Sequence, residues 1–226
     1  MKIASVFIHG MWGTKGDLEF WRQKLEHKMQ SKAIHLDRSN LDKITFEDYV
    51  NQVKRFCEDI SADKLVVIGH SMGGLLAQKV EDKRITKRIL AAPAAPRGIL
   101  GIRNFLQVLF LLGNLNRILF QSAFIPSYSC VQKILFNKSA DEEQYLQPES
   151  TRVFIEVLRG IYVPRRKNVE VFVGSQDRIT PPGAVEKVAK YHGAPFKTFP
   201  EHDHCSICKD EEVADYVISL ANGQNE

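Results

Sequence analysis

The chain has 226 residues, of which 44% are hydrophobic and 26% charged, and its formal net charge is +4. This composition is typical of a soluble globular protein with one substantial core. The charge is too small for the basic surface of a nucleic-acid-binding protein. No uninterrupted apolar stretch reaches the roughly 20 residues of a membrane span. The first apolar run is too short for a signal peptide, and four cysteines do not make a disulfide scaffold, so we expect a cytoplasmic protein without an integral membrane segment.

Strand-like and helix-like segments alternate along most of the chain. The apolar patterns predict strands over residues 3–8, 33–36, 65–68, 88–92, 169–173 and 196–199, and helices over 18–31, 46–60, 71–82, 183–191 and 210–220. Thr45 is a suitable cap for the second helix, because its hydroxyl can accept a free backbone N–H. Repeated strand–helix units of this kind build a parallel sheet with helices on both faces, so we expect an α/β fold.

Residues 98–164 interrupt the alternation. No strand pattern is evident there, and the segment over residues 105–120 is apolar nearly all round. A helix of this kind is either buried on both sides or covers something apolar. The segment is therefore either a cap over a binding site, entered through the proline-rich turn at residues 92–98, or a set of ordinary core helices.

A Gly-x-Ser-x-Gly turn, Gly69–Gly73, joins the third predicted strand to the following helix. Such a turn strains the central serine and lifts its hydroxyl above the carboxyl edge of a sheet. The free N–H groups of the helix N-terminus point at whatever binds there. A serine hydroxyl is a weak nucleophile until a base takes its proton, and the base needs an orienting acid. The five-residue pattern also arises by chance, so Ser71 needs partners elsewhere in the chain.

Suitable partners follow three other predicted strands. Asp177 comes after the strand over 169–173, although a loop aspartate can also simply cap a turn. His202 and His204 come after the last strand, although a histidine taken alone is more often a surface residue. A glycine-rich turn at residues 9–13 follows the first strand and can aim a backbone N–H at the serine; otherwise it is a simple turn with Trp12 in the core. The carboxyl ends of parallel strands share one edge, and the order Ser, Asp, His is that of one known fold.

These motifs resemble those of the α/β-hydrolase family over nearly the whole chain. They are His9-Gly10-x-x-Gly13, Gly69-His70-Ser71-Met72-Gly73-Gly74, the Gly-x-x-Asp-x-x-x-Pro run from Gly174 to Pro181, and the late histidine. The resemblance implies one α/β-hydrolase domain over residues 1–226, with a mostly parallel sheet of about six strands, because two edge strands of larger members have no counterpart here. Residues 98–164 would form a helical cap.

The resemblance also implies the roles of the site residues. Ser71 would be the nucleophile, Asp177 the acid, and the backbone N–H groups of Met11 and Met72 the oxyanion hole. The base maps best to His204, with His202 as the alternative. The substrate pocket is expected to be lined by Trp12, Phe105, Leu109, Leu112, Leu119 and Phe120.

The predicted activity is hydrolysis of small-molecule carboxylic esters or thioesters with apolar acyl groups, with no cofactor and no metal. A C–C hydrolase or lyase using the same residues, and a non-catalytic protein that binds a ligand or partner, are the alternatives. His202, His204, Cys205 and Cys208 lie close enough in sequence to suggest zinc. A structural zinc site usually needs a second ligand cluster, so we expect the two cysteines to pack the start of the last helix. The sequence does not predict an oligomeric state.

Overall fold

Six parallel strands form the central sheet in the computed structural model, which describes residues 1–99, 105–127 and 146–223. The strand order is β2-β1-β3-β4-β7-β8, as expected for about six strands. The strands are β1 (Ile3–Ile8), β2 (Gln30–Ala33), β3 (Lys64–His70), β4 (Ile85–Ala91), β7 (Val169–Gly174) and β8 (Phe196–Phe199). The central strands β1, β3 and β7 are buried over most of their length, as in a parallel sheet covered on both faces.

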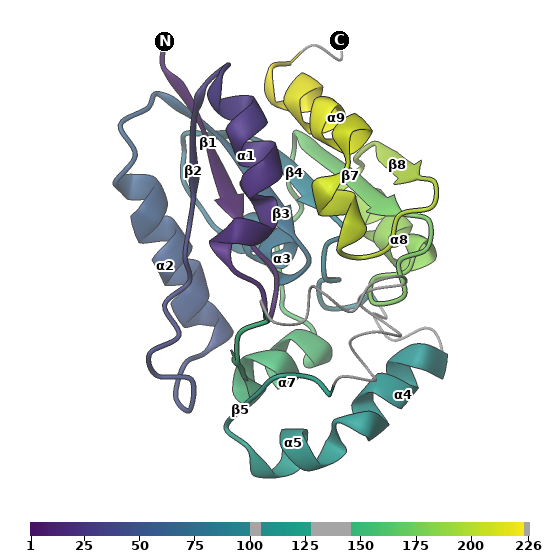
Figure 1. Cartoon of the computed structure of the whole chain (residues 1–226). Helices are drawn as coiled ribbons and strands as arrows, with labels where there is room; N and C mark the ends of the chain where they lie inside the picture. The colour runs from purple at the N-terminus through teal and green to yellow at the C-terminus, as the bar shows by residue number, and fades with distance from the viewer. Residues whose placement is uncertain (100–104, 128–145, 224–226) are drawn as a thin grey trace.

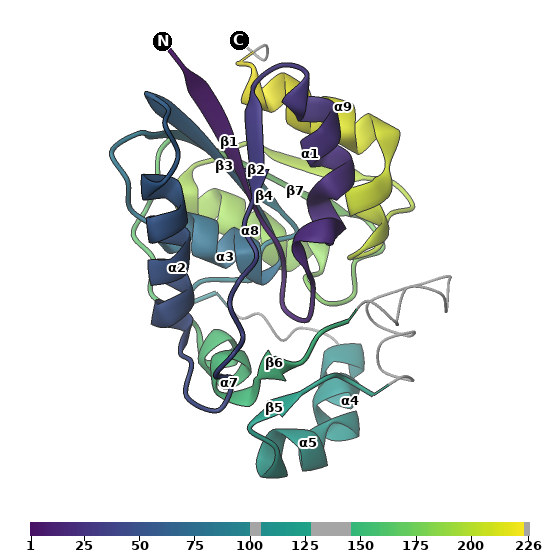
Figure 2. The ribbon, with the colours of Figure 1, turned by 60° about the vertical axis from the view of Figure 1, so that its left-hand side comes forward.

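Helices cover both faces of the sheet (Figure 1 and Figure 2). One layer holds α1 (Glu19–Glu26), α9 (Glu211–Ala221) and the short 3₁₀ segments η1 (Lys15–Leu18) and η4 (Ser206–Lys209), and the other holds α2 (Phe46–Glu58), α3 (Met72–Lys79) and α8 (Pro182–His192). Thr45 caps α2 as predicted, in a reciprocal pair with the Asp48 side chain. Gly193, with φ 67°, ends α8 in the left-handed conformation that glycine adopts without steric cost.

The second strand is displaced from its predicted position. It spans Gln30–Ala33 rather than residues 33–36, and its pairing with β1 ends the preceding helix at Glu26. The apolar residues that suggested a strand, Ile34 and Leu36, are buried beyond it, where they pack on the α2 side of the sheet. The prediction was wrong because these residues pack in the core beyond the sheet ladder.

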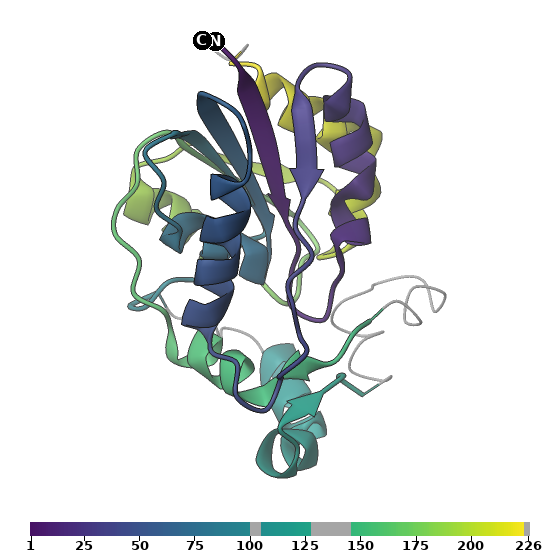
Figure 3. The same cartoon turned by 90° about the vertical axis from the view of Figure 1, so that its left-hand side faces the viewer.

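A smaller group of elements covers the carboxyl ends of the strands, while β1 starts and α9 ends at the opposite end (Figure 3). It contains α4 (Phe105–Gly113), α5 (Leu115–Phe120), α7 (Thr151–Arg159) and the short strands β5 (Ala123–Phe124) and β6 (Glu149–Ser150), which pair antiparallel. We call these elements the cap. Residues 100–104 and 128–145 of the predicted insertion lie outside the described residues. No sequence pattern indicated the β5–β6 pair, because each strand has only two residues.

None of the helices in the part of the chain that the structure describes combines the length and the apolar character of a membrane-spanning segment.

Candidate active site

The register of the sheet brings the predicted site segments to one edge. Ile8 of β1 pairs with Gly69, Ala91 of β4 pairs with Phe172, and Gly174 of β7 pairs with Phe199. The loops that follow these strands therefore start at the same level. They carry the 9–13 turn, Ser71, Asp177 and His204, which is the placement that the sequence pattern predicted.

Ser71 has a strained backbone, with φ 55° and ψ −121°. A residue with a β-carbon holds a positive φ of this kind at a cost of about 1–3 kcal/mol, and only when the surroundings impose it. Gly69 and Gly73, two residues before and two after Ser71, allow the turn to form. A β-carbon at Gly69 would overlap the carbonyl of Gly73, and one at Gly73 would overlap the carbonyl of Ile8 in β1. The serine is thus held between β1, β3 and the start of α3.

This close approach predicts a large stability effect. Gly73→Ala should destabilise the protein by about 3 kcal/mol, because the new methyl group meets backbone atoms that cannot move separately. Gly183→Ala, in α8, is the matched control: nothing lies within 4 Å of its new methyl group, so we expect a change within about 1 kcal/mol. Urea unfolding monitored by circular dichroism measures the free energy of unfolding of both variants. Equal midpoints for the two variants would show that the turn is not tightly packed.

Asp177 and His204 form a buried pair beside the turn. Nδ1 of His204 lies 2.7 Å from Oδ2 of Asp177, and each residue is only 3% exposed. The other carboxylate oxygen, Oδ1, accepts the backbone N–H groups of Ile179 at 2.9 Å and Thr180 at 2.8 Å. The Thr180 hydroxyl lies 2.8 Å from Oδ2. These contacts fix the carboxylate and, through it, the plane of the imidazole.

His202 points elsewhere. Its Nε2 lies 3.5 Å from Oδ2 of Asp210, the residue that caps α9. The backbone around it is nevertheless part of the site, because its carbonyl accepts the N–H of Gln176 at 2.9 Å and packs against Gly174. Cys208 is buried among the apolar residues under α9, in keeping with the expected packing role. Within the described residues, no group of three or more His, Cys, Asp or Glu side chains is placed to hold a metal ion.

Two further histidines stay neutral and position the backbone. Burial, together with the nearby His204, holds the pKa of His70 well below its usual value, and its Nε2 donates to the carbonyl of His204 at 2.8 Å. Burial and the charge of Arg38 lower the pKa of His9 to about 3. Its Nδ1 donates to the carbonyl of Gly10 at 2.9 Å. His70 therefore fixes the loop that carries His204, and His9 fixes the 9–13 turn.

The 9–13 turn lies directly against Ser71. A β-carbon at Gly10 would come within 3.0 Å of the Ser71 β-carbon. The backbone of Met11, the next residue, therefore lies close to the serine. On the other side, Met72 is the first residue of α3, and the first N–H groups of a helix have no acceptor within it. Met11 and Met72 line the same cavity as Ser71.

A buried polar network supports this turn and was not predicted. Arg38 donates to the carbonyl of Gly13 at 2.7 Å and lies 3.3 Å from the fully buried carboxylate of Glu149 in β6. The Tyr49 hydroxyl donates to the same carboxylate at 2.7 Å. The network connects the 9–13 turn to the cap and to α2. Its members come from three distant parts of the chain, so no local pattern could have indicated it.

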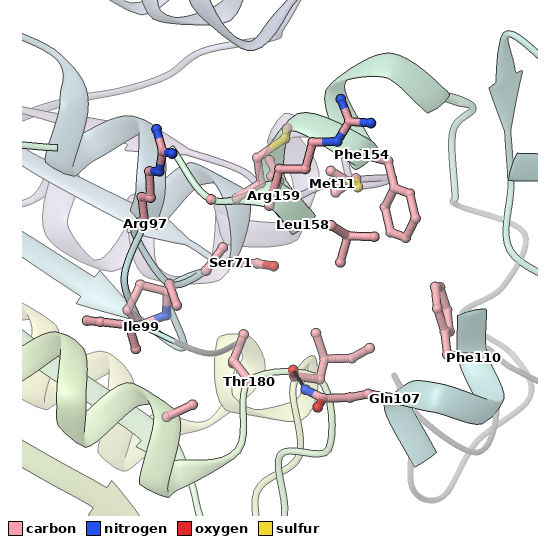
Figure 4. Close-up of a pocket in the computed structure, with 18 of the residues that line it drawn as sticks. Met11, Ser71, Arg97, Ile99, Gln107, Phe110, Phe154, Leu158, Arg159 and Thr180 are labelled. Carbon is pink, nitrogen blue, oxygen red and sulfur yellow. Dashed lines mark hydrogen bonds between the residues drawn. The ribbon is translucent and has the colours of Figure 1, made fainter. Parts of the chain in front are cut away.

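Two cavities meet at Ser71, with volumes of about 500 Å³ and about 440 Å³. We call them the first lobe and the second lobe. Both are lined by Met11, Trp12, Ser71 and Ile179. The first lobe extends under the cap, and most of the residues that line it are apolar (Figure 4). The second lobe contains His70 and His204 together with Asp17 and Lys209.

The predicted lining of the pocket needs correction. Trp12 lines both lobes, and its ring packs against Phe110, Phe124 and Phe154 of the cap. Four other predicted residues face away from the cavity, with exposed fractions of 41% for Leu109, 61% for Leu112, 62% for Leu119 and 82% for Phe120. The side chain of Phe105 lies outside the described part of the chain. The first lobe is lined instead by Ile99, Phe110, Leu111, Phe154, Val157 and Leu158, among others.

The inner face of α4 is marked by its polar residues. Gln107 in α4 and Asn114, the residue directly after it, are both buried. Gln107 donates to the carbonyl of Ile179 at 2.5 Å, and the Asn114 side chain accepts the N–H of Ser127 at 2.8 Å. Phe110 and Leu111 lie between them on the same face. The helix is apolar nearly all round, so its hydrophobic pattern does not select a face. The spacing of the two amides is the signal that could have done so.

A family model described as "Alpha/beta hydrolase family" matches residues 6–216. An sn-1-specific diacylglycerol lipase from Danio rerio is 24% identical over 99 residues, which cover 40% of this chain and 31% of that lipase. The alignment thus spans less than a third of that relative.

Among solved structures, polyneuridine aldehyde esterase has a TM-score of 0.70 at 16% identity, with both chains covered in full. The pyrethroid hydrolase PytH also has a TM-score of 0.70, at 14% identity and with full coverage of both chains. An extracellular alpha/beta-hydrolase from a Paenibacillus species has a TM-score of 0.72 at 16% identity, covering 96% of this chain and 97% of its own. At these identities the structures show the fold alone.

Proposed function

The chain belongs to the alpha/beta hydrolase family, and from that premise we propose that it is a serine hydrolase acting on carboxylic esters or thioesters of small molecules with apolar acyl groups. One observation carries the proposal. The strained Ser71 lines one cavity together with His204, and the imidazole of His204 lies 2.7 Å from the buried carboxylate of Asp177. A nucleophile, a base and an orienting acid are the groups that acyl transfer requires.

In the proposed mechanism, Ser71 Oγ attacks the carbonyl carbon while His204 Nε2 takes the hydroxyl proton. Asp177 holds Nδ1 of the imidazole and stabilises its charged form. The tetrahedral oxyanion is bound by the backbone N–H groups of Met11 and Met72, aimed where the negative charge develops. His204 then gives its proton to the leaving oxygen or sulfur. In the second half of the reaction it activates a water molecule that releases the acid from Ser71.

The environment of the site supports this mechanism. His70 is neutral, so it places no second positive charge beside His204. Asp177 can then stabilise the imidazolium that forms on His204 during the reaction, with no repulsion from a charged His70. The apolar first lobe excludes water around the reacting carbonyl, which strengthens the electrostatic interactions there. The esterase, hydrolase and lipase names of the similar proteins agree with ester chemistry.

A fluorophosphonate probe tests the proposal. The probe reacts with activated serines, so folded protein should acquire one adduct, located at Ser71 by peptide mass spectrometry. Protein that remains folded and unlabelled would exclude a serine hydrolase and favour the non-catalytic alternative. Labelling without turnover of any p-nitrophenyl ester would favour C–C bond chemistry at the same residues.

A further inference from the structure

The position of His204 assigns the two lobes to the two parts of an ester, given the proposed function. The histidine that activates the serine also protonates the leaving atom, so the leaving group lies on its side of Ser71. His204 lines the second lobe, whereas the first lobe is the one lined by Met72 at the start of α3. The leaving group therefore occupies the second lobe, and the acyl group extends into the first.

The first lobe has an unbalanced charge. Its lining includes Arg97 and Arg159, and no aspartate or glutamate among the residues that the structure describes. Both arginines are exposed, and neither forms an ion pair with the described residues. In Figure 4 their guanidinium groups lie along the same edge of the cavity, on the side of Ser71 away from Thr180 and Gln107. The second lobe differs, since it contains both Asp17 and Lys209.

Backbone contacts hold the two arginines at this edge. The N–H of Arg97 donates to the carbonyl of Ile161 at 2.8 Å. Gly160, with φ 85°, ends α7 directly after Arg159, and a β-carbon there would overlap the backbone of Arg97. The two segments are far apart in sequence, but their backbones are held side by side. Both exposed arginine side chains line the apolar first lobe along one edge (Figure 4).

We propose that the preferred acyl group carries a distal carboxylate, which binds Arg97 and Arg159 while its apolar chain fills the first lobe. The substrates would be half-esters or half-thioesters of dicarboxylic acids. Guanidinium groups suit this role because their donors match both oxygens of a carboxylate. The ester bond at Ser71 is the bond that water cleaves, and the distal carboxylate leaves unchanged on the released diacid.

Three p-nitrophenyl esters of equal chain length test the proposal: the hydrogen suberate, its distal methyl ester, and an analogue ending in trimethylammonium. For the unaltered protein at low salt, kcat/KM should be about tenfold higher for the carboxylate than for the methyl ester, and lowest for the cation. High salt should reduce the preference, because the arginines are exposed. In the Arg97→Gln/Arg159→Gln double variant the carboxylate-to-methyl-ester ratio should fall close to unity, and lysine at both positions should restore part of it.

Arg55→Gln is the matched control, since Arg55 is an exposed arginine on α2 that does not line the cavity; its ratio should equal that of the unaltered protein. A ratio near unity in the unaltered protein, or one that survives the double substitution, would overturn the carboxylate proposal while leaving the serine hydrolase in place. If none of the three esters is cleaved, the proposed function itself is overturned.

Discussion

Ser71→Ala should lower kcat/KM for p-nitrophenyl butyrate by about a thousandfold or more and abolish fluorophosphonate labelling. Alanine removes the nucleophile but leaves the oxyanion donors and the binding cavity, so a small residual rate above that in water is expected. The substitution keeps a β-carbon at the strained φ of 55°, and the fold should therefore be retained. Initial rates under pseudo-first-order conditions measure the loss.

Ser39→Ala provides the control for that experiment. Ser39 is an exposed serine outside both lobes, so its removal should leave the rate and the labelling unchanged. A Ser71→Ala protein that is folded and still turns over the ester at a similar rate would place the nucleophile elsewhere.

His204→Ala and His202→Ala should differ by at least about a hundredfold in kcat/KM. His204 is held by Asp177 at 2.7 Å and lines a cavity with Ser71, so its loss removes the base and we expect a decrease of about a thousandfold. His202 contacts Asp210 at 3.5 Å, and its removal should change the rate by less than about threefold. Because that contact is partly exposed, its loss should cost at most about 1 kcal/mol of stability.

The two variants form their own matched pair, since each removes one imidazole from the same short loop. Their thermal unfolding should be compared first, so that a rate difference is not a folding difference. If His202→Ala shows the larger loss of activity, the base has been assigned to the wrong histidine.

The sequence placed the site at the correct edge of the sheet because the features that define it are local. The turn at Gly69–Gly73 needs glycines where β3, β1 and α3 come too close for a side chain, and this requirement is visible in five consecutive residues. Asp177 and His204 follow strands that are recognisable from their own apolar residues. In a parallel sheet every such strand ends at the same edge, so strand positions alone indicate which loops meet.

Tertiary structure decided what local pattern could not express. Both histidines follow β8, and only the packing of their loop turns His204 to Asp177 and His202 to Asp210. The helix α4 is apolar nearly all round, so a hydrophobic stripe does not determine the face that lines the first lobe. The hydrogen bonds of the buried Gln107, and of Asn114 directly after the helix, determine it instead.

Arg97 and Arg159 show the same limit, because they reach one edge of the cavity only through the contact of Arg97 with Gly160 and Ile161. The sequence by itself thus determined the fold, the turn at Ser71 and the loops around it, all of which follow from short-range steric and periodic constraints. The choice of histidine, the lining of the cavity and its charge depend on contacts between distant segments, and these exist only in the folded chain.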